Sequence, residues 1–210
     1  MTITAVQQFY RLHAHVYDST RWLILHRRRP AVAALQLRPD SRVLEVGCGT
    51  GLNFRYLLEY LDPVVGRLVG LDFSPDMLDR ARRRVAAHGW PNVELVCGDA
   101  TSMRLGTHFD AVFFGYSLTM IPDWIGALER ALEHLIPGGR LVVLDFGRFH
   151  AWGPAGALLR GWLRWNHVET LRPYEDYLRD RLADFEVRYW LGGYCFVAAG
   201  RKGASACQPS

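Results

Sequence analysis

The most constraining feature of the sequence is a glycine-rich run over residues 43–51, which reads VLEVGCGTG. The run contains one acid, Glu45, among apolar residues. Glycines then occupy every second position, Gly47, Gly49 and Gly51, and a helical pattern follows. Such a run predicts a buried parallel strand that turns sharply into a helix, with bare backbone where a ligand approaches. The spacing differs from the G-x-G-x-x-G of dinucleotide-binding loops, because Leu52 occupies the position of the third glycine.

The rest of the chain alternates between strand-like apolar runs and helical patterns. Strands are expected near residues 42–46, 67–72, 92–96, 109–115 and 140–146, and helices near 52–61, 75–88 and 124–135. Such alternation predicts a Rossmann-like, doubly wound α/β fold with a mostly parallel sheet. Residues 185–191 and 194–199 form a hairpin pattern around two glycines. We therefore expect a seven-stranded sheet that ends in an antiparallel hairpin strand, preceded by a mostly helical segment over residues 5–37.

Local signals predict where some of these elements begin and end. Ser74 is a good helix cap, since Pro75 follows it and suits the first turn of a helix. Gly138 and Gly139 are expected to close the preceding helix. The basic run over residues 27–30 is expected to break the N-terminal helical segment.

Length and composition are those of one globular unit. With 210 residues, 50% of them hydrophobic and 22% charged, the chain can bury the core of a single domain. We expect that domain over residues 1–202, with a helical cap over 1–38, a substrate-covering insertion over 147–183 and a flexible tail over 203–210. Neither a leader pattern nor a membrane-spanning apolar run is recognisable, which favours a cytoplasmic location.

The sequence lacks the spacing of several common reactive sites. Its cysteines are Cys48, Cys97, Cys195 and Cys207. They form no C-x-x-C pair and mostly fall in apolar runs, which predicts buried, reduced thiols and no disulfide. No zinc pattern, Ser/His/Asp arrangement or phosphate-binding lysine loop is present, so no metal site is expected.

Three acids stand where successive predicted strands end, namely Glu45, Asp72 and Asp99. Open parallel sheets bind ligands outside the carboxyl ends of their strands, so these acids are expected to face one site. The carboxylate of Asp72 can accept both hydroxyls of a ribose, and Asp99 with the Ala100 N–H suits an adenine. The alternative is that Asp72 and Asp99 only cap the helices that follow them.

The glycine run and these acids together resemble the cofactor site of class I S-adenosylmethionine-dependent methyltransferases, over roughly residues 40–146. The resemblance implies S-adenosylmethionine as cofactor and S-adenosylhomocysteine as product. In such a site Glu45 would help to hold the methionine end, and Phe73 or Met77 would cover the adenine. The cofactor-binding residues implied are Glu45, Gly47, Cys48, Gly49, Gly51, Asn53, Asp72, Phe73, Met77, Asp99, Ala100 and Tyr116.

Within this class the sequence resembles small bacterial enzymes that N-methylate lipid head groups, either phosphatidylethanolamine or the homoserine head group of betaine lipids. Quinone C-methyltransferases are similar to a lesser degree. The motifs YD at 17–18, TRW at 20–22, GTGLN at 49–53 and GGY at 192–194 carry this resemblance. It implies a lipid or small-molecule amine as the methyl acceptor.

Two flanking segments, residues 9–29 and 151–165, are expected to contact an anionic membrane surface. The net charge of the chain is +4, and residues 1–30, with five arginines and one aspartate, account for all of it (5 − 1 = +4). The second segment can place four apolar side chains on one helical face, which are Leu158, Leu159, Trp162 and Trp165. Such faces suit a peripheral position on the cytoplasmic side of a membrane, or else they pack on the protein core. Nucleic acid is not an expected partner.

The catalytic candidates are Tyr17 and Tyr116, which could orient an acceptor amine. Further candidates for contact with the amine or its proton are Asp145, His13, His150 and His167. Three alternative functions stay open. They are a C- or O-methyltransferase of a quinone or soluble small molecule, an aminocarboxypropyl transferase on the same fold, and a noncatalytic module that binds S-adenosylmethionine.

Overall fold

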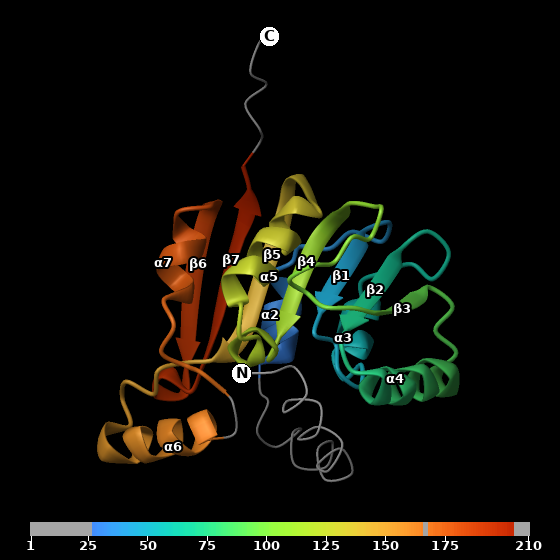
Figure 1. Cartoon of the computed structure of the whole chain (residues 1–210). Coiled ribbons are helices and arrows are strands. Elements are labelled where there is room, and N and C mark those ends of the chain that lie inside the picture. Colours follow the sequence, from blue (N-terminus) through green and yellow to red (C-terminus); the bar gives the residue numbers. More distant parts are fainter. Residues whose placement is uncertain (1–26, 166–167, 204–210) are drawn as a thin grey trace.

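Seven strands form a single sheet in the computed structural model, which describes residues 27–165 and 168–203 (Figure 1). The strands are β1 (Arg42–Val46), β2 (Arg67–Asp72), β3 (Val93–Cys97), β4 (Phe109–Gly115), β5 (Leu135–Phe146), β6 (Leu182–Trp190) and β7 (Cys195–Lys202). Their order across the sheet is β3-β2-β1-β4-β5-β7-β6. Strands β1 to β5 pair in parallel, whereas β7 pairs antiparallel with β5 and β6. The predicted fold class is confirmed.

Helices cover both faces of this sheet, as its apolar strands require. The helices are α2 (Arg28–Ala33), α3 (Phe54–Leu58), α4 (Pro75–His88), α5 (Trp124–Glu133), α6 (Gly153–Trp165) and α7 (Tyr174–Arg179), with short 3-10 turns η1 (Leu118–Met120) and η2 (Leu191–Gly193). Side chains of α2, α3 and α4 share one buried cluster with Val43, and those of α5 and α7 share a second with Leu44. Adjacent residues of β1 thus enter opposite layers, which explains the continuous apolar run.

Several predicted boundaries were wrong for local reasons. Strand β5 begins at Leu135, because Leu135 already pairs with Phe109 before the register shifts. Gly138 and Gly139 therefore lie inside β5 and do not close α5, and Gly138 has a φ of 77° that suits glycine. Helix α2 begins within the basic run over residues 27–30, and the residues before this run lie outside the described residues, so the predicted break stays a prediction.

The remaining sequence predictions concern the glycine-loop helix, the helix cap and the cysteines. Helix α3 spans only Phe54–Leu58, shorter than expected. Ser74 caps α4, since its hydroxyl accepts from the Met77 N–H. Among the described cysteines Cys48 and Cys195 are buried free thiols, but Cys97 is also free and exposed, since β3 is an edge strand.

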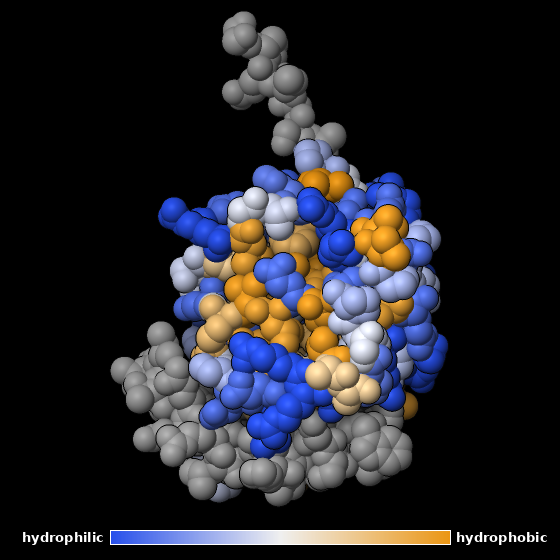
Figure 2. All heavy atoms as spheres, turned by 90° about the vertical axis from the view of Figure 1, so that its right-hand side faces the viewer, coloured by the Kyte–Doolittle hydropathy of each residue, from blue (hydrophilic) through white to orange (hydrophobic). Residues whose placement is uncertain are grey.

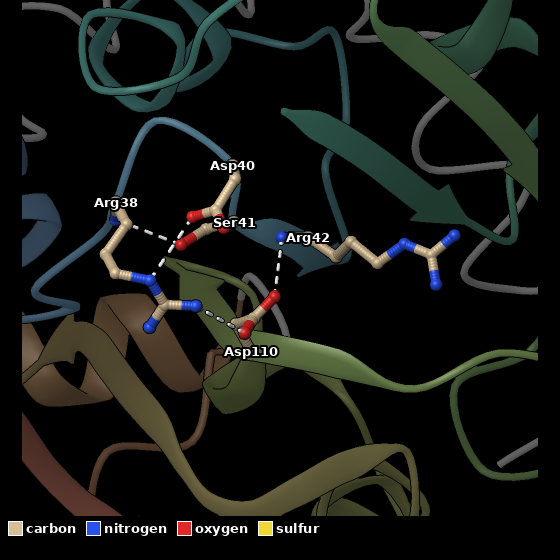
Figure 3. Close-up of polar contacts among 5 residues, drawn as sticks. All are labelled: Arg38, Asp40, Ser41, Arg42 and Asp110. Atoms are coloured by element: carbon tan, nitrogen blue, oxygen red, sulfur yellow. Dashed lines mark hydrogen bonds and ion pairs between the residues drawn. The ribbon is translucent and has the colours of Figure 1, made fainter. Parts of the chain in front are cut away.

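A polar cluster fixes the amino ends of β1 and β4, opposite the glycine loop (Figure 3). Asp110 accepts from the Arg42 backbone N–H at 2.8 Å and from the Arg38 guanidinium at 3.1 Å. Arg38 also donates its backbone N–H to the Ser41 hydroxyl at 2.9 Å. These contacts join the two central strands, so this cluster has a structural role.

The edge of the sheet at β3 is partly uncovered. Figure 2 shows this side of the molecule, where apolar side chains gather among charged ones. A groove of about 470 Å³ lies at the amino ends of the strands, with Arg42, Arg67, Val69, Leu105 and Phe109 in its lining. It lies at the opposite end of the strands from the glycine loop, so it is not the predicted cofactor site. None of the helices in the described part of the chain has the length and hydropathy to cross a bilayer.

Candidate cofactor site

The carboxyl ends of the parallel strands lie at one edge of the sheet, and α6 lies beyond that edge (Figure 1). The strand order reverses between β1 and β4, which are neighbours in the sheet. Ligands of open α/β sheets bind in the crevice at such a switch point. The glycine loop follows β1, so the topology places it at this crevice.

Gly47 allows the loops after β1 and β4 to touch. Its φ is 70°, and a Cβ there would stand 2.6 Å from the Cβ of Ser117. The Ser117 hydroxyl donates to the Val46 carbonyl at 2.6 Å. A side chain at position 47 would therefore be strained and would also push the two loops apart. The sequence predicts that residues 115–118, which include Ser117, line the cleft after the fourth strand, but the contact of Ser117 with β1 depends on the tertiary fold.

Asp72 ties the glycine loop to the start of α4. Its carboxylate accepts from the Gly49 N–H at 2.8 Å and from the Ser74 N–H at 2.9 Å. Burial raises the pKa of Asp72, and these backbone donors lower it. Because Ser74 supplies the helix cap, the capping alternative does not account for Asp72. These backbone donors do not exhaust the acceptor capacity of its two oxygens, so a ribose hydroxyl can still bind.

Glu45 and Asn53 form a buried polar pair beneath the loop. The Asn53 amide donates to Glu45 Oε1 at 2.6 Å, and both residues are buried. Among the described residues, Glu45 Oε2 and the Asn53 carbonyl oxygen meet no hydrogen-bond partner. A Cβ at Gly115 would stand 2.4 Å from the Asn53 amide nitrogen, so this glycine makes room for the pair. Buried acceptors without donors are rare in folded proteins, and they fit a ligand that brings donors.

The electrostatics of Glu45 fit a cationic ligand. Burial raises its pKa to about 8, while the Asn53 hydrogen bond and the charge of Arg28 lower it. The methionyl group of S-adenosylmethionine carries an ammonium with several donors, which would satisfy both free oxygens. These residues therefore fit the cofactor that the sequence predicts.

The remaining loop residues are held as a close-packed turn. Gly49 and Gly51 have φ values of 56° and 74°, and a Cβ at Gly51 would lie 2.7 Å from the Phe54 ring. The Cys48 side chain is buried, and burial raises the pKa of its thiol well above the usual value. The thiol packs near Gly70 and does not act as an ionised group.

The predicted adenine residues lie around the start of α4 and the end of β3. Phe73 is partly exposed, whereas Met77 and Ala100 are buried. Asp99 is exposed, and its Oδ1 accepts from the Thr101 N–H and hydroxyl, each at 2.9 Å. Asp99 therefore stabilises its own turn, but it caps no helix, because β4 is the next element along the described chain. Its contact with an adenine stays a prediction.

Asp145 and Tyr116, two of the residues predicted to contact the acceptor, are both buried. Asp145 is inaccessible, and its carboxylate accepts from the Thr119 hydroxyl at 2.7 Å, the Thr119 N–H at 3.0 Å and the Phe146 N–H at 2.8 Å. It holds the loop after β4 through these internal contacts, and its contact with an amine stays a prediction. Burial raises its pKa to about 6.

Tyr116 remains close to the predicted cleft, but as a neutral phenol. It has a φ of 59°, its ring packs 5.1 Å from that of Phe146, and it is 3% exposed. Burial raises the pKa of Tyr116 far above its usual range, so it can orient a group by hydrogen bonding but cannot accept a proton. A left-handed tyrosine is strained, which is common where a binding site fixes the backbone.

Other candidates lie elsewhere. His150 is exposed and its ring stands 5.5 Å from that of Tyr189. Tyr17, His13 and His167 lie outside the described residues. In the part of the chain that the structure describes, no group of three or more His, Cys, Asp or Glu is arranged to hold a metal ion.

A mostly parallel sheet with an antiparallel end strand, and an acidic glycine loop at its switch point, define the fold of class I S-adenosylmethionine-dependent methyltransferases. Residues 43–139 match a family model described as a methyltransferase domain. A demethylmenaquinone methyltransferase of Bacillus cytotoxicus is 33% identical over 119 residues, which are 56% of this chain and 50% of that protein. One from Shouchella clausii is 28% identical over 199 residues, 83% of this chain and 84% of that protein. The match to the Bacillus cytotoxicus protein therefore spans half the length of that relative.

Solved structures agree on the fold. An S-adenosylmethionine-dependent methyltransferase from Aquifex aeolicus superposes with a TM-score of 0.67 at 21% identity, over 94% of this chain and 98% of that one. Phosphoethanolamine N-methyltransferase 2 of Haemonchus contortus, in complex with S-adenosylmethionine, superposes with a TM-score of 0.75 at 17% identity, over 94% and 60%. These findings support S-adenosylmethionine as the cofactor.

Proposed function

We propose that the protein is an S-adenosylmethionine-dependent methyltransferase that N-methylates the amine of a lipid head group at a membrane surface. The observation that carries the methyltransferase assignment is the buried pair of Glu45 and Asn53. Its free acceptor oxygens lie beside the loop that Asp72 holds. A cationic amino-acid group attached to a nucleoside brings an ammonium that can donate to Glu45 and Asn53. It also brings ribose hydroxyls that can donate to Asp72.

The residues of the site have separable tasks in this reaction. Glu45 and Asn53 hold the ammonium of the cofactor, and Asp72 accepts from its ribose. Bound in this way, the cofactor supplies a methyl group activated by a sulfonium. The protein then has to align the acceptor with that methyl, a task worth up to roughly 7–11 kcal/mol. The apolar surroundings of Tyr116 and Phe146 exclude water and disfavour the charged form of an amine, which leaves its lone pair available.

Helix α6 is the feature that supports a lipid acceptor. Leu158, Trp162 and Trp165 are 78%, 55% and 82% exposed, and their spacing places them on one face. Leu159 was predicted on the same face but is partly buried, because it packs inward with Leu163. Large exposed apolar side chains in a row indicate an interaction surface.

The charge around α6 suits an anionic bilayer. Residues 147–168 contain three arginines and no acid, and one of these arginines, Arg164, forms an ion pair with Glu169 at 3.5 Å. Trp and Arg together are typical of protein surfaces that lie at lipid head groups, where each basic residue contributes about 1 kcal/mol. Of the other predicted membrane segment, residues 9–26 lie outside the described residues. In its described part Arg28 is buried and Arg29 forms an ion pair with Glu59.

Replacing Leu158, Trp162 and Trp165 together by serine is expected to weaken binding to anionic vesicles by about tenfold or more, since the apolar face of α6 is lost. Cofactor affinity should stay unchanged. Sedimentation with phosphatidylglycerol-containing vesicles measures the first quantity and calorimetry the second. Val64→Ser with Val65→Ser is a matched control, because these side chains are 73% and 57% exposed but lie outside α6. Equal vesicle binding by the wild type and the triple variant would mean that α6 does not contact the membrane.

The acceptor can be identified by incubating the full chain with methyl-labelled S-adenosylmethionine and a total lipid extract. Label in an amine-containing phospholipid or betaine-lipid head group supports the proposal. The relatives named demethylmenaquinone methyltransferase favour a second candidate, the ring carbon of a quinone, so a demethylated quinol is tested beside the extract. Release of methylthioadenosine would instead indicate aminocarboxypropyl transfer, and cofactor binding without any turnover would indicate a noncatalytic module.

A further inference from the structure

Thr50 is a buried polar residue at the centre of the glycine loop. It lies between Gly49 and Gly51, both of which have positive φ values, and its exposed fraction is 3%. Its carbonyl and hydroxyl oxygens both accept from Nη1 of the Arg84 guanidinium, the hydroxyl at 3.1 Å. A charged donor therefore reaches the loop from a segment 34 residues further along the chain. Because hydrogen bonds with an ionised donor are stronger than neutral ones, this contact restrains the loop.

Arg84 belongs to α4, the helix that also begins beside the loop. Asp72 precedes α4 and accepts from the Gly49 N–H at 2.8 Å, whereas Arg84 lies near the carboxyl end of the helix. The loop is thus held from two directions, on the N–H of one residue and on the oxygens of the next. Arg84 is partly buried, although it follows Arg82 and Arg83 in a basic run that is typical of a solvent-exposed helix face.

The end of α4 that carries Arg84 is itself held by side-chain contacts. The Arg84 carbonyl accepts from His88 Nδ1 at 2.9 Å, and the His88 ring stacks on that of Trp90 with 4.5 Å between the centroids. Trp90 in turn packs edge-on against Phe54, with 6.4 Å between the centroids. A Cβ at Gly51 would lie 2.7 Å from the same Phe54 ring, so this ring packs against the loop. Arg84 therefore projects from a support that contacts the same loop.

We infer that Arg84 is a positioning residue that acts through Thr50 and holds the glycine loop in the shape that binds the cofactor. This inference rests on the proposed function, because it requires S-adenosylmethionine at the loop. Residues 47–51 include three glycines, and glycine loses more conformational freedom on ordering than any other residue. A loop that is ordered before the ligand arrives does not have to be ordered by the ligand, so the affinity is higher.

The test measures cofactor affinity and loop order on the full chain. Arg84→Met is expected to weaken S-adenosylmethionine binding by about tenfold in calorimetry, since a charge-assisted hydrogen bond to the loop is lost. Without cofactor, amide hydrogen exchange over residues 47–53 should be faster than in the wild type, while exchange over residues 141–144 of β5 stays unchanged. Saturating cofactor should restore the protection of the loop. Arg84→Lys keeps a cationic donor, so its affinity and its loop exchange should lie between those of Arg84→Met and the wild type.

Arg82→Met is the matched control, because it removes the same charge from α4 two positions earlier. The Arg82 side chain is 55% exposed and pairs with Asp79, so cofactor affinity and loop exchange should both stay at their wild-type values. If Arg84→Met does not fold, Arg84→Gln is measured in the same way and is judged by the same outcomes.

The inference requires both effects, so the absence of either the weaker affinity or the faster loop exchange overturns it. Faster exchange in the loop and in β5 alike also overturns it, because Arg84 would then only stabilise the fold. A wild type that fails to bind S-adenosylmethionine would contradict the proposed function itself. Tight binding by the wild type with an unaltered affinity of Arg84→Met contradicts this inference alone.

Discussion

Asp72→Ala is expected to weaken S-adenosylmethionine binding by about 1–3 kcal/mol, which is up to roughly a hundredfold in affinity. The ribose hydroxyls lose a charged acceptor. The Gly49 N–H and the Ser74 N–H lose theirs as well, so the loop is held less firmly in the shape that the cofactor needs. Isothermal titration calorimetry of the purified full chain measures the affinity directly.

Asp79→Ala is a suitable control for Asp72→Ala. Asp79 lies on α4, is about half exposed and forms an ion pair with Arg82. Its removal should change cofactor affinity by less than about 0.5 kcal/mol. Equal affinity of Asp72→Ala and the wild type for S-adenosylmethionine would mean that Asp72 does not bind the cofactor.

The sheet could be predicted because its strands are apolar on both faces. Residues 67–72 and 109–115 were placed correctly, since a strand buried on both sides needs a continuous apolar run and little else in the chain has one. The start of β5 could not be predicted. Pro137, Gly138 and Gly139 are typical of a loop, and only the pairing of Leu135 with Phe109 shows that the strand has already begun.

The candidate site was predictable where it depends on local sequence. The glycine loop and the acid that ends β2 follow from short motifs whose geometry is local. Contacts between distant segments were not predictable. The buried Asp145 is explained by Thr119 on another loop, and the buried Arg28 by an inward-facing position on α2. Charge runs and isolated acids carry no sequence signal that separates a surface position from a buried one.

Glu45→Gln is expected to have opposite effects on stability and on cofactor binding. In the folded protein without cofactor, burial raises the pKa of Glu45 to about 8 from an ordinary value of 4.5. The folded state therefore binds the proton more tightly than the unfolded state. The stability that this group contributes is fully present below pH 4.5 and is lost as the pH rises to 8. Glutamine has no charge to bury and loses nothing over this range.

The free energy of unfolding of Glu45→Gln relative to the wild type should thus increase between pH 5 and pH 9, by on the order of 2–4 kcal/mol. Urea unfolding of the protein without cofactor, at pH 5, 7 and 9, measures this difference. Asp145→Asn is a useful comparison, because burial raises the pKa of Asp145 only to about 6, so its pH-dependent difference should be complete at lower pH. A difference for Glu45→Gln that does not change with pH would mean that Glu45 is ionised in the folded protein throughout.

Glu45→Gln should stabilise the fold at high pH but weaken cofactor binding. The ammonium of the cofactor needs an ionised carboxylate, whereas folding favours the protonated one. Glu45→Gln is expected to weaken S-adenosylmethionine binding by about 2–3 kcal/mol, the contribution of a hydrogen bond to a charged group. Binding to the wild type at pH 6.5 should also release about one proton, since the ligand's positive charge lowers the pKa of Glu45. Calorimetry in buffers of different ionisation enthalpy measures this release, which Glu45→Gln should abolish. Proton release that persists in the variant would show that the ammonium binds elsewhere, and that the stability lost at Glu45 serves no purpose in cofactor binding.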